Sequence, residues 1–201
     1  MRGRSQCDHW IHFKLRRYVR ETHSWANSVN HNRFVRKMEK GRTAMAVEIG
    51  PVDKSNIQRL RELNIQLFPV RYNLAFYKEV VSCSEGYAQL ACVGGYAVGA
   101  ICCRREPIVE GSLGLERTYI MTLGVLESYR RARIGSRLLE GAIAQSIKDG
   151  MVQIYLHVQT SNTAALRFYL SHGFEATQIL RNYYKRIEPP DCYVLRRQLT
   201  P

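Results

Sequence analysis

The stretch TYIMTLGVLESYRRARIGSRLL, residues 118–139, joins an apolar strand, a basic turn and the start of an amphipathic helix. The unpaired backbone N–H groups and the positive dipole end at the beginning of a helix favour a phosphate. Four residues of the turn suit such a ligand because they add cationic donors or permit close backbone approach: Arg130, Arg131, Arg133 and Gly135. The stretch predicts a phosphate-binding turn, and a solvated basic turn before an ordinary helix is the alternative interpretation.

The chain on both sides of this stretch alternates between strand and helix patterns. Strands are expected at residues 46–49, 87–93, 96–103, 117–125, 153–159 and 193–199, and helices at about 53–67, 74–81, 134–147 and 162–169. Residues 104–116 are expected to form a loop, because Pro and Gly recur there. Strands joined through helices in the second half imply a parallel central pair with right-handed crossovers, within a mixed sheet. The fold class is therefore α/β.

The charge of the chain is unevenly distributed. With 45% hydrophobic and 23% charged residues, the 201-residue sequence is typical of a soluble globular protein. No apolar run reaches the roughly 18 residues that a membrane-spanning helix needs. Residues 1–43 hold eleven basic and three acidic residues, so +8 of the net charge of +13 lies there and +5 remains for residues 44–201. Nucleic acid is therefore unlikely as the main partner, since the rest of the chain also lacks a recognised binding motif.

Residues 1–43 show no sustained helix or strand period and little aliphatic content, which indicates a basic, poorly ordered extension. Three interpretations are open. The segment is a tail or an upstream extension before a start at Met38 or Met45, an Arg-rich organelle transit peptide, or a basic arm with stacking aromatic residues. The domain proper is expected to span residues 44–201.

The six cysteines indicate an intracellular protein. They form no CxxC pair and have no metal-ligand spacing, so neither a disulfide framework nor a metal site is predicted. Cys92, Cys102 and Cys103 lie in apolar runs, where a free cysteine usually behaves as a small buried hydrophobic residue. A cytoplasmic location is expected, with the nucleus as a second compartment.

Four motifs together resemble a known family. Residues 118–139, followed by IYLHVQTSNTAALRFYLSHGF at 154–174, are similar to the acetyl-CoA-binding core of the GNAT acetyltransferases. The strings LNIQLFPVRYN at 63–73 and RNYYKRIEPPDCYVL at 181–195 resemble the catalytic subunits of NatE-type N-terminal acetyltransferases. The resemblance covers residues 46–199. It implies a GNAT fold, in which helices flank a mixed central β-sheet with a splayed parallel strand pair.

The resemblance implies transfer of acetyl from acetyl-CoA to the α-amino group of protein N-termini that retain the initiator Met. Tyr119 and His157 match the residues that act through ordered water as general bases, and Tyr169 matches the tyrosine that faces the CoA sulfur. An α-amino group has a pKa of about 8 and must lose a proton before it attacks the thioester, so a histidine base is suitable. Without the resemblance, all three would be ordinary packing residues.

The same resemblance assigns the binding residues. The cofactor-binding set is Leu123, Val125, Arg130, Arg131, Ala132, Arg133, Ile134, Gly135, Ser136, Asn162 and Tyr169. The substrate-binding set is Phe68, Pro69, Val70, Tyr72, Met121, Tyr183, Tyr184 and Ile187. Apolar and aromatic walls suit a Met side chain. The implied partners are peptide N-termini, the NatA catalytic and auxiliary subunits and the ribosome; no membrane and no metal is expected.

Arg133 departs from the family pattern R-x-x-G-x-G, in which this position is glycine. A long side chain here could crowd the phosphates or demand a costly backbone angle, although an added guanidinium attracts a diphosphate. This departure keeps two other functions open. One is a catalytically weak subunit that binds NatA or the ribosome, and the other is a GNAT enzyme that acetylates lysine or small amines.

Overall fold

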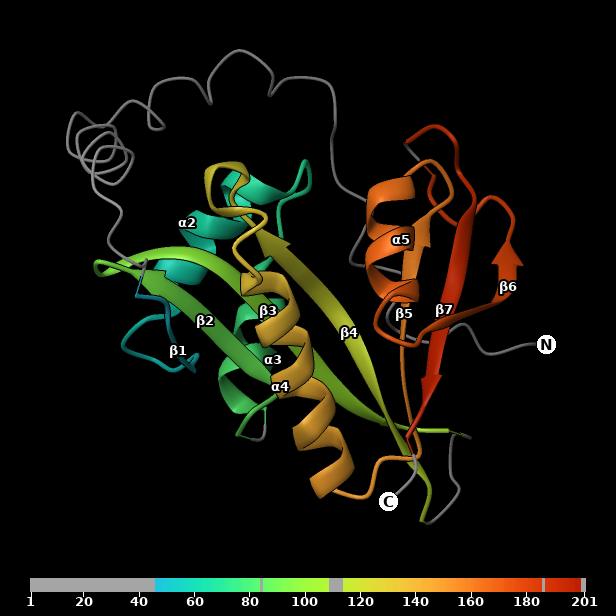
Figure 1. Ribbon diagram of the computed structural model, residues 1–201, viewed down its shortest axis with the longest axis horizontal. Helices are drawn as coiled ribbons and strands as arrows, with labels where there is room; N and C mark the ends of the chain where they lie inside the picture. Colours follow the sequence, from blue (N-terminus) through green and yellow to red (C-terminus); the bar gives the residue numbers. More distant parts are fainter. Residues whose placement is uncertain (1–45, 84, 109–113, 186, 200–201) are drawn as a thin grey trace.

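The computed structural model describes residues 46–83, 85–108, 114–185 and 187–199. The predicted basic extension over residues 1–43 lies outside these ranges. A seven-stranded sheet has the order β1-β2-β3-β4-β5-β7-β6 (Figure 1). Its strands are β1 Glu48–Pro51, β2 Ala88–Val93, β3 Tyr96–Pro107, β4 Glu116–Val125, β5 Gln153–Gln159, β6 Glu175–Leu180 and β7 Cys192–Gln198. The α/β fold predicted from the sequence is confirmed.

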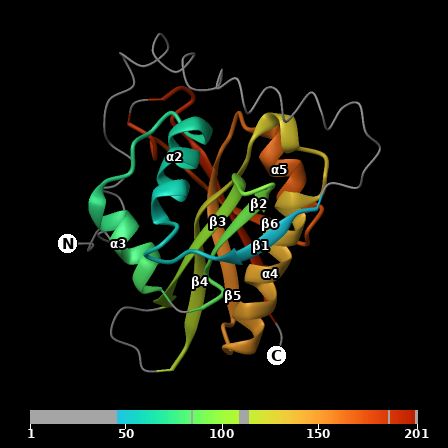
Figure 2. The same ribbon diagram turned by 90° about the vertical axis from the view of Figure 1, so that its left-hand side faces the viewer.

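Helices cover both faces of the sheet. The helices are α2 Ile57–Leu67, α3 Leu74–Ser82, α4 Ile134–Lys148 and α5 Thr163–Leu170. Figure 2 shows α2 and α3 on one side of the sheet and α4 and α5 on the other. Leu60, Leu63 and Val80 of the first pair pack into one hydrophobic cluster. Leu138 and Leu139 of α4 belong to a second, larger cluster. Among the described residues, no helix is long and apolar enough to cross a membrane.

The strands β4 and β5 form the expected parallel pair, but only at one end. The register joins Arg117 to Gln153, Thr118 to Ile154 and Tyr119 to Tyr155, after which the two strands have no further paired residues. Beyond that point β4 pairs only with β3 and β5 only with β7. The two strands diverge visibly in Figure 1. This splay leaves strand edges between α4 and α5 that can receive an extended ligand.

A β-bulge in β4 decides which side chains face the splay. Cys102 pairs with Thr122 but Cys103 pairs with Ile120, so Met121 has no register partner on β3. Side chains of a regular strand alternate between faces, and an extra residue shifts that alternation. Leu123 therefore packs with the cluster under α4, whereas Met121 packs with the cluster under α2 and α3. Because of the bulge, one strand places Leu123 on the face covered by α4, where the cofactor is expected, and Met121 on the face covered by α2 and α3, where the peptide is expected.

Three expectations about element bounds need correction, and one strand was not expected. The first strand runs from Glu48 through Pro51 instead of ending before Gly50, because its residues pair with β2 down to Gln89. The first helix was expected from residue 53, but α2 begins after Asn56, and the Asp53 carboxylate accepts hydrogen bonds from the N–H groups of Ser55 and Asn56 in the turn before it.

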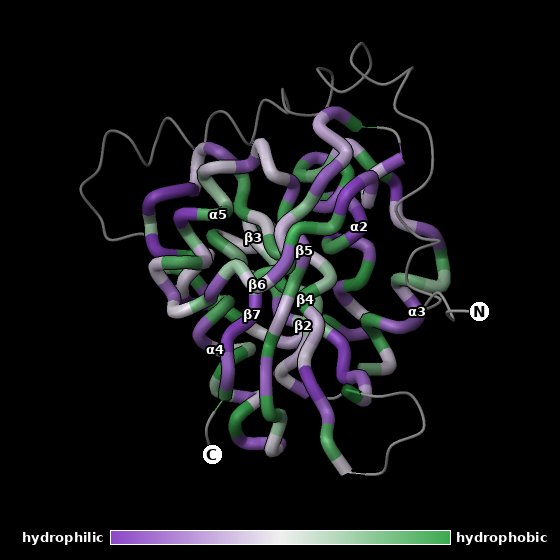
Figure 3. Tube along the Cα trace, turned by 90° about the vertical axis from the view of Figure 1, so that its right-hand side faces the viewer, coloured by the Kyte–Doolittle hydropathy of each residue, from purple (hydrophilic) through white to green (hydrophobic). Residues whose placement is uncertain are grey.

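The expected loop at residues 104–116 is wrong at both ends, since β3 continues to Pro107 and β4 begins at Glu116. The strand β6 was not predicted from the sequence. Its first five residues are exposed, so no buried period marks it. It lies at the sheet edge beside β7, whose first half is hydrophobic and whose second half is hydrophilic (Figure 3).

Candidate active site

Three aromatic or imidazole side chains meet where β4 and β5 part. The Tyr119 hydroxyl lies 3.2 Å from Nδ1 of His157, and the Tyr183 hydroxyl lies 3.4 Å from the same nitrogen. The ring of Tyr183 stacks on His157 with centroids 4.7 Å apart. These residues come from β4, β5 and the segment between β6 and β7, so the sheet register brings together positions far apart in the sequence. The structure thereby brings together two predicted catalytic residues and one predicted substrate residue.

The segment that carries Tyr183 and Tyr184 is fixed by Asp191. One carboxylate oxygen accepts the Asn182 backbone N–H at 2.9 Å and the other accepts the Arg181 guanidinium at 2.6 Å. These two donors hold the pKa of the Asp191 carboxyl below its usual value. The Tyr184 N–H donates to the carbonyl of Pro190 at 2.8 Å. The aromatic wall is therefore held in place by polar contacts that a local sequence pattern does not reveal.

The opposite wall comes from the segment between α2 and α3. Tyr72 stacks on Phe76 with centroids 4.3 Å apart and meets Phe68 edge-on at 5.9 Å. Burial raises the pKa of the Tyr72 hydroxyl, and nearby Cys102 and Tyr119 raise it further, so the group stays neutral. Phe68 and Pro69 line the large pocket described below. The segment thus offers an apolar surface with one neutral hydroxyl.

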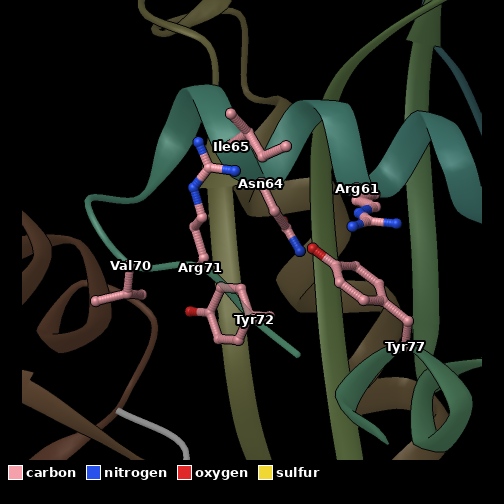
Figure 4. Close-up of a pocket in the computed structure, with 7 residues that line it drawn as sticks. All are labelled: Arg61, Asn64, Ile65, Val70, Arg71, Tyr72 and Tyr77. Carbon is pink, nitrogen blue, oxygen red and sulfur yellow. The ribbon is translucent and has the colours of Figure 1, made fainter. Parts of the chain in front are cut away.

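Val70 and Tyr72 line a second, small cavity of about 30 Å³ on the other side of this segment (Figure 4). The buried side chain of Asn64 reaches into this cavity toward the Tyr77 hydroxyl. The space for water-sized molecules is small compared with that of the large pocket described below.

A pocket of about 670 Å³ lies on the α4 and α5 side of the splay. All predicted cofactor residues except Ala132 line it, and so do six residues that were not predicted. The unpredicted residues are Leu67, Gly124, Tyr129, Ala164, Ala165 and Phe168. Gly124 allows a close approach of the end of α2: a Cβ there would lie 2.8 Å from Cδ1 of Leu67, so the leucine side chain would have to shift. No motif distinguishes these small and apolar residues from core residues, so the sequence could not assign them.

The basic turn before α4 has two residues in the left-handed region. Arg131 has φ of 66° and Arg133 has φ of 58°. The expectation that Arg133 demands a costly backbone angle is confirmed, since a non-glycine residue is strained there. The Arg133 side chain lines the pocket from an exposed position: it is 81% exposed and its guanidinium lies 4.0 Å from Glu140. No side chain caps the first turn of α4, which leaves its amides for a ligand.

The helix α5 closes the pocket. The Asn162 side chain accepts the Ala165 N–H at 3.1 Å and so caps this helix. Tyr169 is buried and packs edge-on against Phe174 with centroids 5.3 Å apart. Burial, with smaller effects of Cys103 and Tyr119, raises the pKa of the Tyr169 hydroxyl, so this group keeps its proton. A protonated phenol beside the pocket is a suitable proton donor.

The two helices around the pocket are joined by His172. Its Nδ1 donates to the Phe168 carbonyl at 2.7 Å, and its Nε2 lies 3.1 Å from the Ser136 hydroxyl. The Arg197 guanidinium donates to the His172 carbonyl at 2.7 Å. Ser136 thus lies on the pocket wall and also links α4 to α5.

These features fit acetyl-CoA. The uncapped first turn of α4 and three arginines suit a diphosphate, and a Cβ on Gly135 would have no neighbour closer than 3.7 Å, so the backbone there is open. The narrow splay between β4 and β5 suits an extended chain. Among the residues that the structure describes, no group of three or more His, Cys, Asp or Glu could hold a metal ion.

The family model of the acetyltransferase (GNAT) family matches residues 57–174, more than half of the sequence. The chain belongs to this family.

Two curated relatives and one solved structure make the likeness more particular. The chain is 47% identical to N-alpha-acetyltransferase 50 of Danio rerio, over 76% of this chain and 89% of the relative. It is 42% identical to the probable N-acetyltransferase san of Drosophila melanogaster, over 78% and 83%. The structure of Arabidopsis thaliana Naa50 in complex with the bisubstrate analogue CoA-Ac-MVNAL matches with a TM-score of 0.68 and 44% identity, over 75% of this chain and 97% of that chain. The enzyme class implied by the sequence, an acetyl-CoA-dependent N-alpha-acetyltransferase, is confirmed.

Proposed function

We propose that this protein acetylates the α-amino group of protein N-termini that retain the initiator Met, with Tyr119, His157 and Tyr169 as catalytic residues. The observation that carries the proposal is the contact of the Tyr119 hydroxyl with Nδ1 of His157 at the parting of β4 and β5. The Arabidopsis relative binds an analogue whose peptide begins with Met, which supports the choice of substrate.

The base is the His157 imidazole. Tyr119 positions the water molecule through which the proton of the α-ammonium group reaches this imidazole. A histidine titrates near neutral pH and an α-ammonium group at about pH 8, so the proton transfer is nearly balanced in energy. The tyrosine has a reference pKa of about 10 and is therefore a positioning group rather than a free base. The neutral amine then attacks the thioester carbonyl.

Acetyl-CoA supplies an activated acetyl thioester when bound. As the C–N bond forms and the C–S bond breaks, the Tyr169 hydroxyl donates a proton to the departing sulfur. The second proton of the amine restores the tyrosine, and the proton held by His157 leaves to solvent. One proton is therefore released for each acetyl group transferred.

The first peptide residue is held between Phe68 and Pro69 on one side and Tyr183, Tyr184 and Ile187 on the other, with Met121 at the base. Apolar and aromatic groups favour an unbranched thioether side chain. Neutral tyrosine hydroxyls give hydrogen bonds to the peptide backbone without demanding a charged side chain. This arrangement favours Met over Ser or Ala as the first residue.

A pair of peptides tests the proposal on the full chain. Peptides that differ only in a first residue of Met or Ser, each followed by Leu, are incubated with acetyl-CoA, and CoA release is measured. We expect at least a tenfold higher kcat/KM for the Met peptide, since burial of a Met side chain contributes roughly 1.5–3 kcal/mol. Equal rates for both peptides, or rates unchanged by His157→Ala, would refute it.

Two wider assignments remain proposals. We place the protein with the NatA subunits at the ribosome, because an enzyme that acts on N-termini meets them there first. We also propose a cytoplasmic and nuclear location, which the free thiols of Cys83, Cys92, Cys102, Cys103 and Cys192 support. Co-purification of tagged full-length protein with ribosomes and NatA subunits tests the first assignment, and separation of cytoplasmic and nuclear fractions tests the second.

A further inference from the structure

A half-buried carboxylate lies beside the catalytic rings. The Glu106 side chain is 17% exposed, and its two oxygens have four donors from three residues. Arg117 donates to Oε1 through Nε at 2.9 Å and Nη2 at 2.8 Å, Arg104 donates to Oε2 at 3.2 Å, and the Tyr155 hydroxyl donates to Oε1. Charge-assisted hydrogen bonds of this kind are about twice as strong as neutral ones.

The sheet register places this cluster on the same face as the catalytic residues. Arg104 of β3 is opposite Tyr119 of β4, which is opposite Tyr155 of β5. Glu106 and Arg117 form the next row, two residues farther from the splay. Because side chains two residues apart share a face, the cluster and the catalytic pair form one continuous surface.

The groups that Glu106 holds are the groups that touch the catalytic rings. The Arg104 guanidinium lies 5.0 Å over the Tyr119 ring, and the Tyr155 ring centroid lies 5.0 Å from that of Tyr119 and 5.9 Å from that of His157. The Arg117 guanidinium lies 4.5 Å over the Tyr155 ring. Glu106 thus restrains the neighbours of Tyr119 on both adjacent strands.

The same carboxylate balances positive charge near His157. The titratable groups that face this surface are Arg104, Glu106, Arg117, Tyr155, Tyr183, Tyr184, Tyr72, Glu79 on α3 and Arg196 of β7. Burial first, and Glu106 second, raise the pKa of Tyr155, so its hydroxyl remains a donor to the carboxylate. Arg104 also lies 3.8 Å from the Glu79 carboxylate, which is farther than its 3.2 Å contact with Glu106.

We propose that Glu106 is a positioning residue for acetyl transfer, which holds Tyr119 and His157 in the reacting arrangement through Arg104 and Tyr155. The inference rests on the proposed catalytic roles of Tyr119 and His157. Glu106 itself does not touch the substrate.

The test replaces Glu106 in the full chain by Gln, which keeps the size but removes the charge. We expect kcat to fall about tenfold, as for other groups that orient a reacting side chain, while the acetyl-CoA Kd changes less than about twofold. The acid limb of the kcat/KM profile moves to lower pH, because added net positive charge disfavours the imidazolium of His157. Glu106→Asp restores the acid limb and part of kcat.

The matched control is Glu116→Gln. Arg105 and Glu116 form an ion pair between the same two strands but on the opposite face, away from the catalytic rings. We expect this variant to keep the wild-type kcat and pH profile. A common loss in both glutamine variants would show a general effect on the β3–β4 ladder and overturn the proposal.

A second variant covers the case in which Glu106→Gln does not fold. Tyr155→Phe keeps all charges and removes one donor, so kcat should fall about threefold without movement of the acid limb. His157→Ala is measured in the same assay and is expected to be inactive. In that case, a wild-type kcat for Glu106→Gln overturns this inference alone. If Glu106→Gln does not fold, a wild-type kcat for Tyr155→Phe has the same meaning. Wild-type activity of His157→Ala overturns both this inference and the catalytic assignment.

Discussion

The cofactor side and the catalytic side of the splayed strands are built in different ways. On the cofactor side, the part that suits the diphosphate is one local unit, the turn and the first turn of α4 from Arg130 to Ser136, while residues of α2, β4 and α5 line the rest of the pocket. The catalytic side has Tyr119, His157 and Tyr183 from three separate segments, held together by sheet register. We expect a local unit that uses backbone amides to tolerate a side-chain change such as the arginine at position 133. We expect a site made of side chains from distant segments to be more sensitive.

The largest effect is expected on the catalytic side. His157→Ala should lower kcat by about 10²–10³, the typical contribution of a general base, and leave acetyl-CoA binding within about twofold. Initial rates with a Met-Leu peptide and the thermal shift caused by acetyl-CoA measure the two sides separately. If His157→Ala lost acetyl-CoA binding as well as activity, the catalytic side and the cofactor side would not be separate.

Tyr169 lies where the two sides meet, and its replacement should have the next largest effect. Tyr169→Phe keeps the packing against Phe174 but removes the proton donor, so kcat should fall about tenfold or more. Because the pKa of this phenol is raised, the variant should lose activity equally across pH 7 to about 9. A pH-rate profile checks this. A loss confined to alkaline pH would assign a different role.

Alkaline pH tests the core that both sides share. Burial, with the nearby Asp149 carboxylate, raises the pKa of Tyr87 to about 12. A raised pKa stabilises the fold fully below the unfolded value near 10, and this contribution is lost as pH rises toward 12. Burial also raises the pKa of Cys102 to about 12 from a usual value of 9.

We therefore expect the Tm to fall progressively above about pH 9 and steeply between about 10 and 12. Melting curves from pH 8 to 11.5 measure this. Tyr87→Phe should flatten the decline, whereas Tyr96→Phe at the exposed hairpin should not. A Tm that is constant up to pH 11 would contradict the assignment.

The smallest effect is expected on the cofactor side. Arg133→Gly relieves a left-handed residue and should stabilise the fold by about 1 kcal/mol, or roughly 2–4 °C in Tm. Arg131→Gly is the matched variant, since Arg131 is also left-handed. Acetyl-CoA binding should weaken only about threefold in Arg133→Gly, because its side chain points to solvent. Calorimetry at two salt concentrations measures the Tm and the acetyl-CoA Kd. Loss of acetyl-CoA binding in Arg133→Gly would show that the Arg133 side chain is essential.

The sequence could predict the local features of this molecule well. The helix from Ile134, the strand Gln153–Gln159, the cap at Asn162 and the hairpin at Gly94 and Gly95 all follow from periodicity and turn chemistry. The catalytic and cofactor residues came from the resemblance of four motifs, since no period distinguishes Tyr119 or His157 from packing residues.

Long-range features were not predictable. The bulge at Met121 depends on the pairing of β3 with β4, and the cluster around Glu106 depends on register across three strands. The strand β6 has almost no buried residue and exists because β7 offers it an edge. In each case the information lies in the partner strand, not in the segment itself.

The most direct test of the central claim is the position of the acetyl group on one peptide. A peptide that begins Met-Leu and carries an internal lysine is incubated with acetyl-CoA and the full-length protein, and the product is mapped by tandem mass spectrometry. We expect acetylation of the α-amino group by the wild type and its near absence with His157→Ala. Acetylation mainly at the lysine, or an undiminished α-amino product with His157→Ala, would contradict it.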